Sequence, residues 1–127
     1  MRIFKSRWFE RFARKEGIAD SDLCRAIALA EGGQIDADLG GGVIKQRIAR
    51  PGEGKSKGYR TFIFFRRGTR AFFVYGFAKS RMANIGDDEK DQFKEAARVV
   101  LALTETQLAV RLKNGDFVEV KRDEQEV

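Results

Sequence analysis

The side chains in this sequence that are able to do chemistry are cations, tyrosines and carboxylates. The 127 residues include no histidine and one cysteine, Cys24. A structural zinc site and any catalytic triad that depends on histidine are therefore excluded. Lys and Arg can hold a phosphate group, and Lys and Tyr can transfer protons when their surroundings shift the pKa. Any catalysis must use these groups.

Two further features of the sequence carry little chemistry. Asp36 and Asp38 have a spacing that can hold a divalent cation, but a single D-x-D pair in a polar segment is more typical of a turn. We therefore expect no metal and no cofactor. Cys24 has no cationic partner near it in the sequence and is expected to be packed and inert.

The cations are concentrated in one part of the chain. In total there are 25 Lys and Arg residues against 19 Asp and Glu, a net charge of +6. Residues 45–81 hold 11 of the cations and one anion, Glu53, which is +10, whereas the remainder is at −4. A localised cationic field attracts a polyanion, and nucleic acid is the commonest one in a cell.

Three apolar runs in and beside this cationic segment predict three consecutive antiparallel strands. The runs are rich in β-branched and aromatic residues and span residues 43–50, 59–66 and 71–79. A short link containing Gly68 joins the second run to the third at the length of a hairpin turn. The second run is apolar on both sides, which is typical of a central strand.

Alternation along the runs assigns the cations to faces of the predicted sheet. In the first run Lys45 and Arg47 lie on the side opposite to Ile44 and Ile48. In the second run Arg60 is costly to bury without an anion, so we interpret it as a functional residue.

The segments that flank the strands add further cations. Residues 51–58 are rich in glycine and predict a loop suited to a phosphate backbone, with Lys55 and Lys57 as its cations; the alternative is a solvated linker. Lys79 and Arg81 follow the third run, and we expect their side chains to converge on the mouth of this loop.

Four helices are predicted from apolar periodicity and capping residues, over residues 6–16, 20–32, 87–103 and from residue 104. Trp8 and Phe9 lie on the apolar face of the first helix. We expect them to pack in the core rather than to stack on bases. A short strand is predicted at each end of the chain, over residues 2–5 and 117–120.

Length and composition predict a single domain over residues 1–127, with a core over about 3–103, an extension over 104–127 and a frayed tail from 121. No apolar run approaches the ~20 residues that cross a bilayer. The N-terminus lacks a continuous apolar stretch of the kind found in signal peptides. We therefore expect a cytoplasmic protein that does not associate with membranes.

The chain resembles the RelE/HigB-type toxins of bacterial toxin–antitoxin pairs, in particular a HigB-like branch, over about residues 4–101. The blocks that carry the resemblance are Trp8-Phe9, residues 15–18, 38–45, 54–60 and 72–80. Lys57 stands where this branch more often has glycine, and Gly86 stands where a serine cap is common. Neither difference removes a candidate catalytic group.

The resemblance implies an α+β fold in which a small twisted, mainly antiparallel sheet carries helices on one face. It also implies an endoribonuclease that cuts messenger RNA, often on the ribosome, and that a cognate antitoxin protein silences. In such an enzyme the ribose 2′-hydroxyl would attack the adjacent phosphorus, while the protein stabilises the anionic transition state.

Candidate roles follow for the cations and tyrosines. Arg60 and Arg81 would clamp the phosphate, and Tyr59 or Tyr75 would protonate the leaving oxygen or stack on a base. The general base is left open between Lys79, Lys55 and Lys45. The residues expected to hold RNA are Lys45, Arg47, Lys55, Lys57, Arg67 and Tyr75.

Two alternatives use the same fold. One is a relative that poisons DNA gyrase by binding it and cuts nothing. The other is an RNA-binding module without catalysis, which would use the cationic sheet only to hold a backbone.

Overall fold

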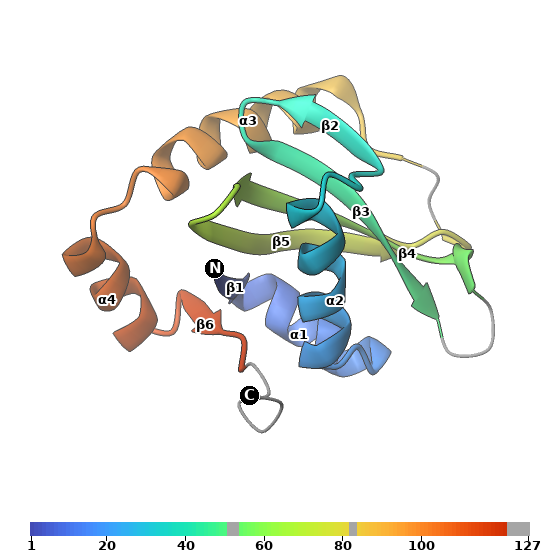
Figure 1. The fold of residues 1–127 in the computed structure, drawn as a ribbon, viewed down its shortest axis with the longest axis horizontal. Helices are drawn as coiled ribbons and strands as arrows, with labels where there is room; N and C mark the ends of the chain where they lie inside the picture. Colours follow the sequence, from blue (N-terminus) through green and yellow to red (C-terminus); the bar gives the residue numbers. More distant parts are fainter. Residues whose placement is uncertain (51–53, 82–83, 122–127) are drawn as a thin grey trace.

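The computed structural model describes residues 1–50, 54–81 and 84–121, except for the side chains of residues 54–57. Its elements are, in order, β1 (Arg2–Ser6), α1 (Arg7–Glu16), α2 (Asp20–Glu31), β2 (Ala37–Gly40), β3 (Val43–Arg50), β4 (Gly54–Arg66), β5 (Arg70–Ala78), α3 (Asp87–Leu101), α4 (Glu105–Lys113) and β6 (Phe117–Glu119). The strands form one sheet in the order β2-β3-β4-β5-β1-β6 (Figure 1). The α+β class is confirmed.

The three strands predicted in the cationic segment form the centre of the sheet. β3 pairs antiparallel with β4, and β4 pairs antiparallel with β5, so β4 is the central strand of this group as expected. β1 joins β5 in parallel, while β2 and β6 join β3 and β1 antiparallel. The sheet is therefore mainly antiparallel, in agreement with the prediction.

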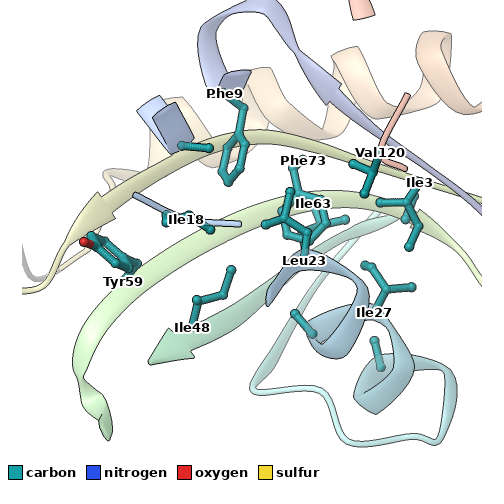
Figure 2. Packing of buried hydrophobic residues seen from close by; sticks show 14 of the residues in the cluster. Ile3, Phe9, Ile18, Leu23, Ile27, Ile48, Tyr59, Ile63, Phe73 and Val120 are labelled. Carbon is teal, nitrogen blue, oxygen red and sulfur yellow. The ribbon is translucent and has the colours of Figure 1, made fainter. Parts of the chain in front are cut away.

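The helices α1 and α2 pack on one face of the sheet. Ile44, Ile63 and Phe73, from the three central strands, are buried there against Phe9 of α1 and Leu23 of α2. Figure 2 shows these two helices contributing side chains to the same cluster as the strands.

The helix α3 packs on the opposite face. Val43, Phe64 and Phe72 point to this side and are buried with Ala97 and Leu101 of α3. Helices thus cover both faces of the sheet, where one covered face is expected from the sequence. The reason lies in β4, whose side chains are apolar on both sides, so that a single layer of helices would leave its phenylalanines in water.

Capping residues set the helix boundaries where the sequence predicts them. The Ser6 hydroxyl accepts a hydrogen bond from the Phe9 amide at the start of α1, and Gly17 ends this helix with a φ of 74°. Thr104 accepts from the Gln107 amide to begin α4. These caps satisfy backbone groups that the helix itself leaves without partners.

Three segments differ from expectation. Residues 37–40, expected as part of a polar turn, form the edge strand β2. β4 begins at Gly54, so most of the loop predicted over residues 51–58 is strand, and residues 51–53 lie outside the described residues. Leu108 and Val120 are buried in the two main clusters, so the segment that follows residue 103 contributes to the core.

The tail from residue 122 lies outside the described residues, and of the frayed tail expected from residue 121 only Lys121 is described; its amide donates to Asp20 Oδ2. Among the helices of the described part, none is long and apolar enough to cross a membrane.

Candidate nucleic-acid interface

The register of β3, β4 and β5 brings three of the predicted cations together on the face that carries α3. Arg47 lies directly opposite Arg60, and Lys45, two residues before Arg47, lies opposite Phe62. Side chains directly opposite on one face have Cβ atoms about 4.5–5.5 Å apart. Lys45, Arg47 and Arg60 therefore form one group, called the cationic cluster below.

Arg60 is the most buried member of the cationic cluster, with 5% of its surface exposed. Burial and the positive charge of Arg47 lower the pKa of its guanidinium, while the Asp36 carboxylate acts in the opposite direction. Because guanidinium groups in proteins stay protonated, the cation is held in this partly desolvated position and keeps its charge. Such a group gains most when an anion binds beside it.

Lys45 is half-buried beside Arg60. Burial lowers the pKa of its ammonium group, and so do the charges of Arg60, Lys90 of α3 and Arg47; Asp36 again opposes the shift. A lysine whose pKa is lowered in this way has a larger neutral fraction at a given pH and is a better base.

Asp36 is the one carboxylate that acts on both pKa values in the cationic cluster, and it already has partners within the described residues. Its Oδ2 accepts a hydrogen bond of 2.6 Å from the Arg47 amide, and its own amide donates to Gln46 Oε1. The Asp38 carboxylate accepts from the Gly40 amide. Asp36 thus bonds to β3 just before β2 begins, and Asp38 bonds to the backbone at the end of β2.

An aromatic floor lies beside the cationic cluster on the same face. Phe77 is directly opposite Arg60, and Tyr75 is directly opposite Phe62. The Tyr75 ring centroid lies 6.1 Å from that of Phe62 and 5.8 Å from that of Phe93 in α3. Phe62 and Phe77 are buried, whereas Tyr75 and Phe93 are partly exposed. Cations beside accessible aromatic rings are the combination that binds single-stranded nucleic acid, and Tyr75 is the ring of this group that lies nearest to such a role.

The cations after β5 lie at the same end of the sheet as Arg60. Because Tyr59 pairs with Ala78, Lys79 and Arg81 follow directly beyond this row. The Lys79 amide donates to the Gly58 carbonyl at 3.1 Å, which fixes the start of the turn. Both side chains are exposed. The predicted mouth of the loop cannot be traced further, because the side chains of Lys55 and Lys57 lie outside the described residues.

Tyr59 does not join the cationic cluster. It follows the alternation of β4 onto the opposite face, is 2% exposed, and packs in the cluster formed with α1 and α2 (Figure 2). Its hydroxyl donates to the Glu16 carbonyl at 3.2 Å. The geometry therefore contradicts the expectation that Tyr59 acts on the same phosphate as Arg60.

Arg67 also lies away from the cationic cluster. It follows the other end of β4, seven residues from Arg60, which is roughly 23 Å along a strand. Its guanidinium donates to the Glu31 carbonyl at the end of α2, at 2.6 Å and 3.1 Å. Its place in the fold is that of a helix-capping residue rather than one that holds RNA beside Arg60.

Two residues of this site were not predicted from the sequence. Phe77 could have been found, because it has the same alternation as Tyr75 in a strand that was predicted. Lys90 could not have been found, because it reaches the site only where α3 packs on the second face of the sheet, which was expected to carry no helix.

A family model described as the RelE toxin of the RelE/RelB toxin–antitoxin system matches residues 1–120. The match does not separate a HigB-like branch from the rest of this family. No curated protein matches the chain.

Proposed function

The chain belongs to the family of RelE toxins from toxin–antitoxin systems, and we propose that it is a metal-independent endoribonuclease that cleaves messenger RNA on the ribosome. The observation that carries the proposal is the cationic cluster: Lys45, Arg47 and Arg60 share one face, and two of them have lowered pKa values. A family of toxins that generally cleave messenger RNA makes the RNA phosphodiester the anion of choice for this cluster.

In the proposed reaction the ribose 2′-oxygen attacks the adjacent phosphorus. A base removes the 2′-hydroxyl proton, the bond to the 5′-oxygen breaks, and an acid or water protonates that oxygen. The products are a 2′,3′-cyclic phosphate and a 5′-hydroxyl end. Negative charge accumulates on the phosphoryl oxygens in the transition state, and in this proposal Arg60 and Arg47 stabilise it.

Lys45 is the base that the geometry supports best. It lies on the same face as Arg60 and Arg47, and its pKa is lowered by burial and by their charges. Lys79 remains the second candidate, with Arg81 as an additional phosphate clamp, because both lie beyond the same end of β4 and β5. Tyr75 lies on the same face of the sheet as the cationic cluster, so we assign to it the proton-donor or stacking role that was considered for either tyrosine.

The alternative of an RNA-binding module without catalysis is favoured by one observation. Tyr59 is buried on the far face, so a tyrosine directly beside Arg60 is missing from the described residues. Water or Tyr75 would then have to protonate the leaving oxygen. Binding a gyrase without cleavage is a second alternative, and no feature of the described surface favours it.

A cognate antitoxin is the protein partner of toxins in this family. We propose that an Asp- and Glu-rich antitoxin segment covers the cationic cluster and folds as it binds. The concentration of +10 in residues 45–81 supports this, because an acidic segment would neutralise the field that attracts RNA.

The proposed function is tested by incubating the purified protein with translating ribosomes and mapping new 5′ ends on the messenger RNA. The same message without ribosomes and the Arg60→Ala variant serve as matched samples. New 5′-hydroxyl ends that require the wild-type protein support the nuclease. Tight binding without new ends in either sample would favour the module without catalysis.

A further inference from the structure

Among the aromatic side chains in the described part of the chain, Trp8 is the exposed one, with 44% of its surface in contact with solvent. The sequence predicts that it packs in the core with Phe9. Phe9 is indeed fully buried. Trp8 instead lies at the border of the helix face, where its indole can reach a ligand.

The Trp8 indole is held by two rings and is not a loose surface group. It stacks on Phe12, one turn further along α1, with ring centroids 5.3 Å apart and planes at 16°. It also lies against Tyr75 of β5, with centroids 4.7 Å apart. With both rings in contact, Trp8 still keeps part of its surface exposed, and exposed aromatic side chains are the ones that can receive a nucleobase.

The position of α1 against β5 explains why these rings meet. β1 pairs with β5 only as far as Phe73, so the edge of the second half of β5 faces the start of α1. The Ser6 hydroxyl donates to the Val74 carbonyl at 3.3 Å and ties the helix start to this edge.

Gly76 allows the close approach of the helix. A Cβ atom at this position would lie 2.9 Å from Phe12 Cε2 and 3.3 Å from Phe9 Cε2. It would also lie 3.1 Å from the Arg60 carbonyl oxygen. Such distances are shorter than normal contacts, so a larger residue would displace these rings. The glycine thus leaves room for Phe12, the ring on which Trp8 stacks.

Tyr75 connects Trp8 to the cationic cluster. It lies opposite Phe62 in β4, and Phe62 lies opposite Lys45 in β3. Tyr75 and Arg60 are diagonal neighbours across the β4–β5 pair, and residues in this relation are typically about 7–8 Å apart along the sheet. An aromatic path therefore runs from exposed Trp8 across Tyr75 to the residues that we assign to the phosphate.

We propose that the exposed part of the Trp8 indole is a stacking site for a nucleobase of single-stranded RNA, next to the nucleotide whose phosphate the cationic cluster holds. The inference rests on the proposed function and adds a base-binding residue to it. The occupant is an RNA base rather than an apolar protein segment because a cationic cluster lies at the other end of the aromatic path, and phosphates connect successive bases.

The chain has a single tryptophan, so its intrinsic fluorescence reports on this position alone. The probe is a short single-stranded RNA with 2′-O-methyl groups, which prevent cleavage by removing the nucleophile. Its partner probe has the same length and phosphates but abasic sugars. Binding is followed in parallel by anisotropy of a dye on the oligonucleotide, so that binding and stacking are measured separately.

We expect the RNA with bases to quench Trp8 fluorescence and the abasic probe to bind more weakly without quenching. Trp8→Ala should lower the affinity for the RNA with bases by about 5- to 100-fold and leave the affinity for the abasic probe unchanged. Trp8→Phe should retain most of the affinity. Val110→Ala, at an exposed hydrophobic position on α4, is the control and should change neither affinity.

Several results would overturn the stacking site. One is equal quenching by both probes. Another is RNA binding that leaves the Trp8 fluorescence unchanged and is unaffected by Trp8→Ala. Either result would show that no base stacks on Trp8, while the nuclease proposal would stay intact. Quenching by an antitoxin but not by RNA would assign the indole to a protein contact instead. If neither probe binds at all, the stacking site for free RNA fails, while the nuclease proposal is decided separately by the ribosome assay above.

Discussion

Arg47 and Arg60 lie directly opposite each other on neighbouring strands, and burial together with the charge of Arg47 lowers the pKa of the Arg60 guanidinium. Like charges placed directly opposite on one face of a sheet destabilise the pair. An anion that binds beside both cations would reduce this repulsion.

Arg47→Gln should separate stability from RNA binding. Removing one of two repelling cations is expected to leave the free energy of unfolding unchanged or to raise it slightly. RNA affinity should fall, and the slope of log affinity against log salt should lose about one unit. Urea unfolding and binding titrations at several salt concentrations measure both effects. A large loss of stability with unchanged RNA affinity would identify Arg47 as a structural residue.

Lys45→Arg tests the assignment of the base. Since the pKa of Lys45 is lowered by burial and by Arg60, Lys90 and Arg47, the cleavage rate of the wild type should rise with pH and level off below the ordinary lysine value of about 10.4. Arginine keeps the positive charge but stays protonated, so the rising limb should disappear.

Lys79→Arg is the matched control for this pH profile. It changes the second candidate base in the same way and should leave the rising limb in place. The opposite pattern, a normal profile for Lys45→Arg and a lost limb for Lys79→Arg, would transfer the role of base to Lys79.

Tyr59→Phe should affect stability and not cleavage. The substitution removes the hydroxyl that donates to the Glu16 carbonyl, at a cost of about 0.5–1.5 kcal/mol, and keeps the buried ring. Tyr75→Phe, on the other face, should lower the cleavage rate with little change in stability. Single-turnover cleavage and thermal unfolding of both variants check that Tyr75, and not Tyr59, acts in cleavage. A cleavage defect confined to Tyr59→Phe would reverse this assignment.

Lys5 provides a prediction about stability and pH. It is 8% exposed and its ammonium pairs with Glu10 at 2.6 Å and Asp20 at 2.9 Å. Burial alone would lower the pKa of Lys5, but these carboxylates outweigh it and raise the value, while Lys5 lowers the pKa of Glu10. The pair therefore stabilises the fold above the ordinary carboxyl pKa and loses this contribution as pH falls through the lowered pKa of Glu10.

Lys5→Met should accordingly cost about 1–3 kcal/mol near pH 7, and the difference from wild type should shrink below about pH 4. Urea unfolding at several pH values measures this. Arg25→Met removes an exposed pair with Asp22 and is the control, expected to change stability little. A cost for Lys5→Met that stays constant down to pH 3 would show that lost packing, and not the ion pairs, causes it.

The sequence predicts part of the cationic cluster: alternation puts Lys45 and Arg47 on one face of their strand, but the register that sets Arg60 opposite Arg47 comes only from the structure. The same alternation puts Tyr59 on the other face from Arg60. Tyr59 and Arg60 are adjacent in the sequence, but neighbouring residues of a strand point to opposite faces of the sheet, so the two side chains do not act together.

Other features depend on tertiary packing and could not be obtained in this way. Trp8 has the helical spacing of a core residue, but the buried stripe of α1 is narrow and is filled by Phe9 and Ala13. Lys90 reaches the site only because α3 crosses the second face. Arg67 carries the right charge, yet the end of α2 lies beside it and accepts its hydrogen bonds.

The central claim, that the cationic cluster stabilises the transition state of RNA cleavage, is tested most directly by single-turnover cleavage on ribosomes with Arg60→Lys and Arg60→Ala, each checked for normal thermal unfolding. We predict that both folded variants lose about 10²- to 10³-fold in rate, since lysine keeps the charge but lacks the planar guanidinium. Cleavage by folded Arg60→Ala at a rate near that of the wild type would contradict the account.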